Sequence, residues 1–524
     1  MFSKVLSAAI IGVEAIPVQV EADVSNGLPG FVMVGYLSTQ VREAQDRIRA
    51  SFRNAGISVP PKKITINLSP ADVRKEGSRF DIPIAAAVLA ACGLIPERST
   101  EGVVMVGELS LNGRVNRVNG ILATVMRAKQ TGASACVVPM DNYCEATLID
   151  GITIVGINSM NDLVNFLRFG EIPSSDSICD KKGGGFFAGS FENDDNNSGN
   201  SPDFSNVKGQ EFAKRAAVIA AAGYHNMLMT GPPGSGKSMI ASRIPTILPG
   251  LSRDECLEIT QIYSVAGKLK KENPIITERP FRAPHHTITG KALTGGGIIP
   301  VPGEVTLAHR GVLFLDEIPE FGRNAIEVLR VPLEEKKVTV TRMAGACEFP
   351  ANFLLIAARN PCPCGYYPDM NRCKCTSQEI MRYQNRISHP VLDRIDIHVR
   401  VEGMKYDDIS NTYDENSEKN GARMSSNQMR ATVSRAYSVQ KKRFEGSANN
   451  IHFNSEIPSS LIGEYCPLSD SAEKVLREAF EKMKLSARSY HRIIKVARTI
   501  ADIEASFFIE EEHVMEALMY RNGY

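Results

Sequence analysis

The pattern of apolar and polar positions predicts three kinds of local structure along this chain. Residues 18–24 alternate between apolar and mostly polar side chains, as in a strand with one buried face. Residues 40–54 instead place their apolar side chains three or four positions apart, which predicts a helix. Continuous apolar runs, which suit strands buried on both faces, occupy residues 226–230, 311–315 and 353–358.

Breaks in this pattern divide the chain into five parts. One polar stretch is rich in Gly and Asn and another in Asn, Ser and Glu, and neither can bury enough apolar surface to fold alone. The three remaining parts are long enough to bury a core. We therefore expect an N-terminal domain at 1–170, a flexible linker at 171–204, an α/β core at 205–402, a polar insertion at 403–428 and a helical C-terminal domain at 429–524.

The composition narrows the class of protein. The 60 Lys and Arg residues are balanced by 59 Asp and Glu, so net charge does not indicate a nucleic-acid binder, although a ring can confine positive charge to its pore. No apolar run approaches the roughly 20 residues that span a bilayer. The first residues resemble a strand more than a signal peptide. The 11 cysteines are scattered except for one group of four, which argues against a disulfide framework. We expect a cytoplasmic protein without membrane association.

The stretch at residues 231–238 fits the phosphate-binding pattern Gly-x4-Gly-Lys-[Ser/Thr] at every fixed position. An apolar run precedes it and a helical sequence follows, as the motif requires. Lys237 is expected to reach the β- and γ-phosphates, and the Ser238 hydroxyl to ligate Mg²⁺. The alternative is a Gly/Pro turn without a ligand. The predicted nucleotide-binding residues are Gly231, Pro232, Pro233, Gly234, Ser235, Gly236, Lys237 and Ser238.

A second motif supports the first. Residues 311–317 form an apolar run that ends in two carboxylates. Asp316 is expected to hold the magnesium ion, and Glu317 to polarise the water that attacks the phosphate. The two motifs together predict an ATPase with ATP and Mg²⁺ as its cofactors.

Two further groups of residues resemble metal ligands. Two Cys-x-Cys pairs can supply four thiolates to a tetrahedral Zn²⁺, although zinc ribbons more often have two intervening residues and reduced thiols in a loop are the alternative. These cysteines are Cys362, Cys364, Cys373 and Cys375. His285 and His286 are adjacent, and adjacent side chains are expected to point apart. For the histidines we therefore predict a hydrogen-bonding role.

The segment between the two ATP motifs resembles a known family. It reads Pro-Phe-Arg-x-Pro-His-His-Thr, then three glycines, then Pro-Gly-Glu-(x)3-Ala-His-Arg-Gly-Val-Leu-Phe-Leu-Asp-Glu. This order is similar to the ComM/YifB branch of magnesium-chelatase-like AAA+ ATPases, and the resemblance covers nearly the whole chain. It implies an α/β fold: an AAA+ P-loop ATPase core with a helical C-terminal lid, preceded by an α+β Lon-protease-like domain.

The resemblance also implies a homo-hexameric ring with a pore. An insertion in the second helix of the core projects into that pore in relatives, which makes residues 288–302 candidates to touch a polymer. The basic stretch at 336–342 alternates with period two, so we expect it to form half of a hairpin near the pore. A solvated edge strand guarded by Lys is the alternative.

Several nucleotide-contacting roles follow from the resemblance alone. Val207 and Gln210 would lie beside the adenine, unless they merely begin a capped helix. Asn360 matches sensor 1, which orients the attacking water, and Arg359 is the alternative.

Two arginines complete the set that the resemblance implies. Arg394 matches the arginine finger, which often comes from the neighbouring subunit, and an ion pair with Asp393 or Asp396 is the alternative. Arg488 matches the sensor-2 arginine, with Arg492 as the alternative one helical turn further on.

The N-terminal domain resembles Lon proteases but lacks their catalytic pair. Lon proteases carry the catalytic Ser in Gly-Pro-Ser-Ala-Gly, and the matching stretch here sets Arg79 against the nucleophile, with Ser78 beside it. The partner Lys is expected within residues 121–124, which contain none. Because a Ser nucleophile needs a nearby base, we expect no protease activity.

Relatives in the resembled family imply three functions. The first is a hexameric motor on single-stranded or branched DNA, a helicase or branch-migration factor in recombination and natural transformation. The alternatives are a magnesium-chelatase-like motor and a protein-remodelling AAA+ ATPase acting on a protein partner. The Lon-like domain and the Cys-x-Cys pairs favour the first, since chelatase motor subunits generally lack both.

Overall fold

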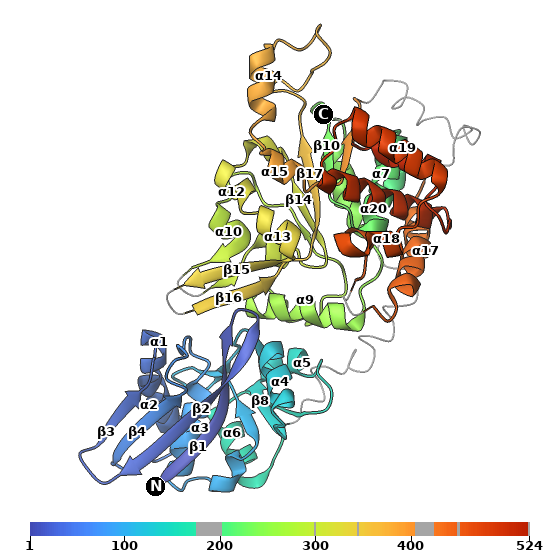
Figure 1. The fold of residues 1–524 in the computed structure, drawn as a ribbon. Coiled ribbons are helices and arrows are strands. Elements are labelled where there is room, and N and C mark those ends of the chain that lie inside the picture. Colours follow the sequence, from blue (N-terminus) through green and yellow to red (C-terminus); the bar gives the residue numbers. More distant parts are fainter. Residues whose placement is uncertain (174–201, 298–299, 343–344, 404–423, 448–450, 522–524) are drawn as a thin grey trace.

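The computed structural model describes residues 1–173, 202–297, 300–342, 345–403, 424–447 and 451–521. Most of the expected linker and of the polar insertion lies outside these residues. An N-terminal α/β domain lies below a second α/β domain, and the C-terminal helices pack against the side of the second (Figure 1).

The N-terminal domain is built on a seven-stranded mixed sheet with the order β3-β4-β2-β1-β5-β8-β9. The alternation at residues 18–24 lies in β2, and its apolar side chains are buried as expected. The strands are β1 (Phe2–Ile11), β2 (Glu14–Ser25), β3 (Gly30–Val34), β4 (Lys63–Ser69), β5 (Val103–Met105), β8 (Ala135–Pro139) and β9 (Thr153–Ile157). The short antiparallel pair β6 (Glu108–Leu109) and β7 (Val115–Asn116) turns at Gly113, whose φ is +84°.

Helices cover this sheet, and α3 (Asp81–Ala91) is buried along its whole length. The helix expected at 40–54 is interrupted at Glu43, so that two helices, α1 and α2, occupy the stretch. The other helices here are α1 (Thr39–Arg42), α2 (Ala44–Asn54), α4 (Ile121–Gln130), α5 (Tyr143–Ala146) and α6 (Met160–Phe169).

The second domain contains a five-stranded parallel sheet with the order β11-β14-β17-β10-β18. The strands are β10 (Met227–Thr230), β11 (Phe281–Arg282), β14 (Val312–Leu315), β17 (Leu354–Arg359) and β18 (Ile397–Arg400). Each apolar run places buried side chains on both faces of the sheet. In β10, for example, Met227 and Met229 belong to one apolar cluster, whereas Leu228 belongs to the other. A strand buried on both faces must be apolar throughout, which explains the uninterrupted runs.

Different helices bury the two faces. The first cluster contains α7 (Glu211–Gly223), α8 (Lys237–Ile247) and the C-terminal helices. The second contains α10 (Gly290–Thr294), α12 (Arg323–Glu327), α13 (Arg330–Glu335) and α15 (His389–Leu392). Phe204, placed at the end of the linker by the sequence, is fully buried in the first cluster.

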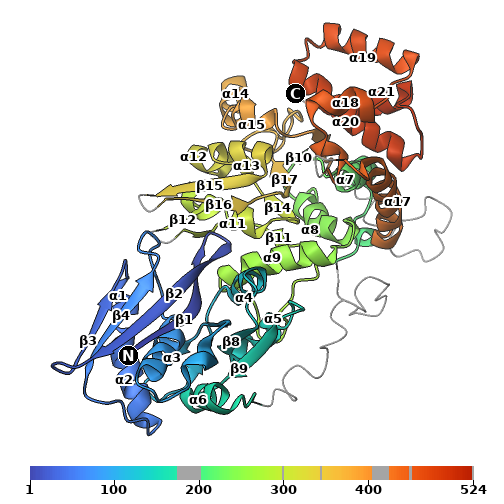
Figure 2. The ribbon, with the colours of Figure 1, turned by 60° about the horizontal axis from the view of Figure 1, so that its bottom comes forward.

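The C-terminal helices share their core with the parallel sheet (Figure 2). They are α17 (Ser426–Phe444), α18 (Ile462–Tyr465), α19 (Asp470–Lys482), α20 (Ala487–Ile503) and α21 (Glu511–Met519). Ser425 and Gln428 form a capping box, so α17 begins before the expected boundary at 429. The backbone N–H of His398 donates to the Tyr520 carbonyl (2.8 Å), which ties the end of the chain to β18.

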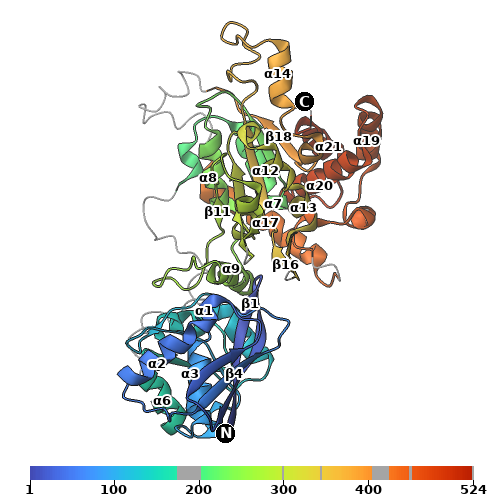
Figure 3. The same ribbon diagram turned by 90° about the vertical axis from the view of Figure 1, so that its left-hand side faces the viewer.

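Helix α9 (Arg253–Val265) lies across the junction of the two α/β domains (Figures 1 and 3). Leu122 and Leu148 of the N-terminal domain pack with Ile259 of α9 in one apolar cluster. The hairpin of β15 (Lys337–Arg342) and β16 (Gly345–Pro350), expected from the basic stretch, approaches Gly12 at the turn between β1 and β2. Its relation to a pore stays a prediction.

Candidate functional site

The Gly-rich loop connects the carboxyl end of β10, which lies between β17 and β18 in the parallel sheet, to the start of α8. Gly234 and Gly236 have φ values of +74° and +88°, which L-residues with side chains rarely adopt. A Cβ on Gly231 would lie 2.2 Å from the carbonyl oxygen of Val401. The motif therefore needs these glycines for backbone reasons, and the loop presents the N-terminus of α8 to an anion.

Lys237 is held where phosphate oxygens are expected. Its Nζ donates to the carbonyl oxygens of Gly231 and Pro232 (both 2.8 Å) and lies 3.3 Å from Oδ1 of Asn360. Burial lowers the pKa of Lys237, while the charges of Asp316 and Glu317 oppose this shift. Carbonyls supply no negative charge, so a phosphate is a stronger partner for this ammonium group than its present contacts.

The expected magnesium ligands also meet. The Ser238 hydroxyl donates to Oδ2 of Asp316 (2.7 Å), so the two oxygens that would ligate Mg²⁺ are adjacent. Glu317 follows with φ +50° and ψ +47°, a left-handed conformation that is uncommon for a residue with a side chain. Such strain occurs often at functional sites.

Asn360 and Arg359, the two sensor-1 candidates, have different surroundings. Asn360 lies beside Lys237. The guanidinium of Arg359 donates to the Thr230 hydroxyl at the end of the neighbouring strand (3.1 Å). The geometry thus favours Asn360 for contact with a phosphate, and its role stays a prediction.

Of the two candidates for contact with the adenine, Gln210 is linked to the same loop through residues 402 and 403. Val207 is buried, and the Gln210 side chain donates to the carbonyl of Glu402 (2.7 Å). The next residue, Gly403, lies against Pro232 of the loop. This chain of contacts places the start of α7 beside the candidate nucleotide site.

The four cysteines converge. All four sulfurs lie within 4.8 Å of one another. The Cys362–Cys364, Cys364–Cys373 and Cys362–Cys373 sulfur distances are 3.3, 3.5 and 3.7 Å. A tetrahedral zinc with bonds of about 2.3 Å needs sulfurs roughly 3.8 Å apart, so the group fits that ion. A hydrogen bond from the Tyr366 backbone lowers the pKa of Cys364 to about 6, which favours the thiolate.

The cysteine loop also contacts the phosphate-binding loop. A Cβ on Gly365, where φ is +86°, would lie 2.4 Å from Cδ of Pro233. A group that fixes the cysteine loop therefore also supports one wall of the nucleotide site.

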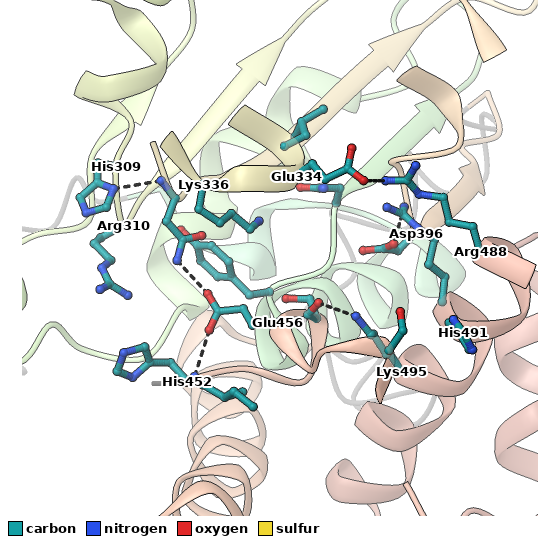
Figure 4. Close-up of a pocket in the computed structure, with 18 of the residues that line it drawn as sticks. His309, Arg310, Glu334, Lys336, Asp396, His452, Glu456, Arg488, His491 and Lys495 are labelled. Atoms are coloured by element: carbon teal, nitrogen blue, oxygen red, sulfur yellow. Dashed lines mark hydrogen bonds and ion pairs between the residues drawn. The ribbon is translucent and has the colours of Figure 1, made fainter. Parts of the chain in front are cut away.

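The two predicted arginines lie elsewhere, at the amino-terminal edge of the parallel sheet. The Arg394 carbonyl accepts a hydrogen bond from the side chain of Asn226, which lies immediately before β10. Because Lys237 follows the other end of β10, the length of that strand separates Arg394 from Lys237. Arg394 pairs with Glu334. Arg488 pairs with the same carboxylate (2.5 Å), as Figure 4 shows. The structure does not bring either arginine to the phosphate-binding loop of its own chain.

A cavity of about 840 Å³ lies at this amino-terminal edge, between the sheet and α20. Arg492 pairs with Asp396 across it (2.7 Å), and the charge of Arg492 helps to hold the pKa of the buried Asp396 well below its usual range, against the opposing effect of burial. The Asp396 carboxylate also contacts His225 (3.4 Å). Arg394 thus pairs with Glu334, and neither Asp396 nor Asp393, the partners considered from the sequence, is its ion-pair partner among the described residues. No sequence signal singled out Glu334.

The expectation that the adjacent histidines point apart is wrong. The rings of His285 and His286 lie 4.0 Å apart, because these residues belong to an irregular segment without strand alternation. Nδ1 of His285 lies 2.9 Å from the Thr287 hydroxyl, consistent with the predicted hydrogen-bonding role.

In the N-terminal domain, Arg79, which is set against the Lon nucleophile, contacts the stretch 121–124 in which the partner Lys was expected. The Arg79 guanidinium donates to the Thr124 hydroxyl (2.9 Å), and the neighbouring Ser78 donates to Glu108. The buried Lys75 donates to the Pro70 carbonyl and does not line the cavity that contains Ser78.

A parallel α/β sheet with a phosphate-binding loop, an adjacent Ser–Asp pair and a helical C-terminal domain defines a P-loop ATPase of the AAA+ type. Family models agree: "Magnesium chelatase, subunit ChlI" matches residues 203–409, "Subunit ChlI of Mg-chelatase" matches 20–142, and "Magnesium chelatase, subunit ChlI C-terminal" matches 423–521. The chain belongs to the ComM/YifB type of the magnesium-chelatase-like AAA+ family.

Similar proteins extend along the whole chain. The competence protein ComM of Haemophilus influenzae is 40% identical over 519 residues, covering 99% of this chain and 97% of that protein. The uncharacterized protein YifB of Escherichia coli is 38% identical over 521 residues, covering 99% and 97%. Lon protease 2 of Bacillus subtilis is 31% identical over 122 residues, 23% of this chain and 21% of that protein. None of the helices described is long and apolar enough to cross a membrane.

Proposed function

We propose that this chain is an ATP-driven motor on DNA, which acts as a helicase or branch-migration factor in recombination and natural transformation. The ATPase part rests on the arrangement of Lys237, Ser238, Asp316 and Asn360 at the carboxyl edge of the sheet. Glu317 is the proposed base that polarises the attacking water.

We propose that the active form is a homo-hexameric ring. The support is the separation of Arg394 and Arg488 from the phosphate-binding loop of the same chain. In a ring, the amino-terminal edge of one subunit can face the nucleotide of the next, where both arginines would stabilise charge on the γ-phosphate. Glu334 then neutralises them until that phosphate arrives.

The DNA part rests on the similarity to a competence protein along nearly the full length of both chains. It is tested by ATP turnover with no polymer, single-stranded DNA, duplex and a four-way junction, each at two salt concentrations. Stimulation that is greatest on branched DNA and falls steeply with salt is the expected result. Unchanged turnover with all three forms, in a preparation that assembles rings, would contradict the proposal in favour of a protein client.

We further propose that the four cysteines bind a structural zinc ion. The sulfur distances given above fit a tetrahedral site, and zinc would fix the loop that packs on Pro233. Metal analysis of the purified protein should find about one zinc per chain, and its absence from freshly prepared, reduced protein would refute the proposal.

A further inference from the structure

A second cavity, in the N-terminal domain, takes no part in the ATPase site. It has a volume of about 540 Å³ and lies between α2, the loop after it, and strands β3 and β4. This is the side of the domain where β3 forms the edge of the sheet, labelled at the left in Figure 1. Phe31, Phe52 and the prolines at 60 and 61 contribute apolar surface to it.

Three cations line this cavity: Arg49, Arg53 and Lys62. None of its lining residues carries a carboxylate, and none of the three cations forms an ion pair with a residue that the structure describes. Arg49 and Arg53 are four positions apart on α2 and so share one face of the helix. This contrasts with the cavity at the ATPase sheet, where Glu334 and Asp396 already neutralise arginines.

One of these cations lies over an aromatic ring of the same cavity. The Arg49 guanidinium lies over the ring of Phe31, 5.6 Å from its centroid. A cation and an aromatic ring of the cavity lining are therefore in direct contact.

We propose that this surface, defined by Arg49, Arg53, Lys62 and Phe31, binds single-stranded nucleic acid. Cations without counter-ions match the charge of phosphates, and an apolar, aromatic floor matches the faces of unpaired bases. A duplex offers phosphates but keeps its bases stacked inside, so it would leave the apolar floor unused. The proposal extends the proposed action on DNA by giving the N-terminal domain its own contact with a displaced strand.

The test measures binding of the full chain, without ATP, to a labelled oligo-dT of about 20 nucleotides by fluorescence anisotropy over a salt series. The pocket variant is Arg49→Gln/Arg53→Gln/Lys62→Gln. The matched control is Arg42→Gln/Arg98→Gln/Lys129→Gln, which removes three exposed cations of the same domain that line neither this cavity nor the one that contains Ser78. Thermal melting and gel filtration establish that each variant is folded.

The pocket variant is expected to bind oligo-dT about tenfold more weakly. Its log–log salt slope should be shallower by about 2, since each single-strand phosphate contact contributes about 0.7. Arg49→Lys/Arg53→Lys should retain most of that slope, because the charge remains. The control variant should bind like the wild type.

Three results would overturn the proposal. They are wild-type affinity in the pocket variant, an equal loss in the control variant, and competition by poly-glutamate as effective as that by unlabelled oligo-dT. If the pocket variant lost as much affinity for a labelled duplex as for oligo-dT in the same assay, the preference for single strands would be overturned. Because no ATP is present, the outcome is separate from that of the turnover assay. DNA that binds this pocket without stimulating turnover would leave the inference standing and refute the proposed motor.

Discussion

The two edges of the parallel sheet carry opposite kinds of site. At the carboxyl edge, Lys237 is held by carbonyl oxygens, and the backbone of the Gly-rich loop is arranged for an anion. At the amino-terminal edge, Arg394 and Arg488 already share the carboxylate of Glu334. The lysine at one edge thus donates to neutral groups, whereas the arginines at the other edge are already ion-paired.

This difference has a physical consequence for assembly. Strands rise about 3.3 Å per residue, so the two edges of a short parallel sheet are more than 10 Å apart. A guanidinium at one edge cannot reach a phosphate bound at the other edge of the same chain. If the arginines act on ATP, they act across a subunit boundary, and each prediction below tests one side of that division.

The largest effects are expected from Arg394→Ala and Lys237→Ala. Arg394→Ala should lower ATP turnover by roughly 10³-fold, the usual contribution of an arginine finger, while ATP binding persists. Lys237→Ala should be inactive because it removes the ammonium group from the phosphates. Mixing the two variants should restore part of the turnover, since some boundaries then combine an intact loop with an intact arginine. A mixture as inactive as its parents, in rings shown to exchange subunits, would contradict action across the boundary.

Glu317→Gln should lower turnover by about 10²-fold or more, because the amide cannot polarise the attacking water. Binding of a fluorescent ATP analogue should be retained. Glu320→Gln is the matched control: it lies nearby, pairs with Arg386 (2.7 Å) and should be nearly fully active. Full activity in Glu317→Gln would overturn the assignment of the base.

Acid should reduce the stability contributed by the ion pairs at the amino-terminal edge in particular. Burial alone would raise the pKa of Glu258, but hydrogen bonds and charges from His309 and Arg310 lower it from 4.5 to about 2. A lowered folded-state pKa contributes stability that is present above pH 4.5 and is lost as pH falls toward about 2. Glu258 is partly exposed, so we expect on the order of 1 kcal/mol.

Urea unfolding at several pH values checks this expectation. In Glu258→Gln, the free energy of unfolding should fall less steeply than in the wild type as pH is lowered from 4.5 to about 2. Glu272→Gln, at an exposed position, should leave the decline as it is in the wild type. Identical profiles for all three proteins would show that this ion cluster does not contribute.

The smallest effect is expected from Cys364→Ser/Cys373→Ser. Loss of the metal should loosen the loop that packs on Pro233 and raise the KM for ATP about threefold with little change in kcat. Cys92→Ser, in the N-terminal domain, serves as the control. An unchanged KM together with an unchanged zinc content would argue against both the site and its supporting role.

Local patterns were sufficient for much of the fold. The uninterrupted apolar runs were correctly predicted as buried strands, the alternation at 18–24 as a half-buried strand, and the basic stretch at 336–342 as half of a hairpin. Patterns failed where regular periodicity ends. A helix expected as one piece at 40–54 is two, and the rings of His285 and His286 lie side by side because their segment is irregular.

The sequence by itself determined the phosphate-binding loop and the Ser238–Asp316 pair, since backbone geometry and short-range order require those residue types at fixed spacing. Only the tertiary structure decided that Glu334 joins Arg394 to Arg488, that Gly365 packs on Pro233, and that Arg49, Arg53 and Lys62 share a cavity without a carboxylate. These contacts join residues far apart in the chain, and their geometry depends on how whole elements pack, which no local pattern records.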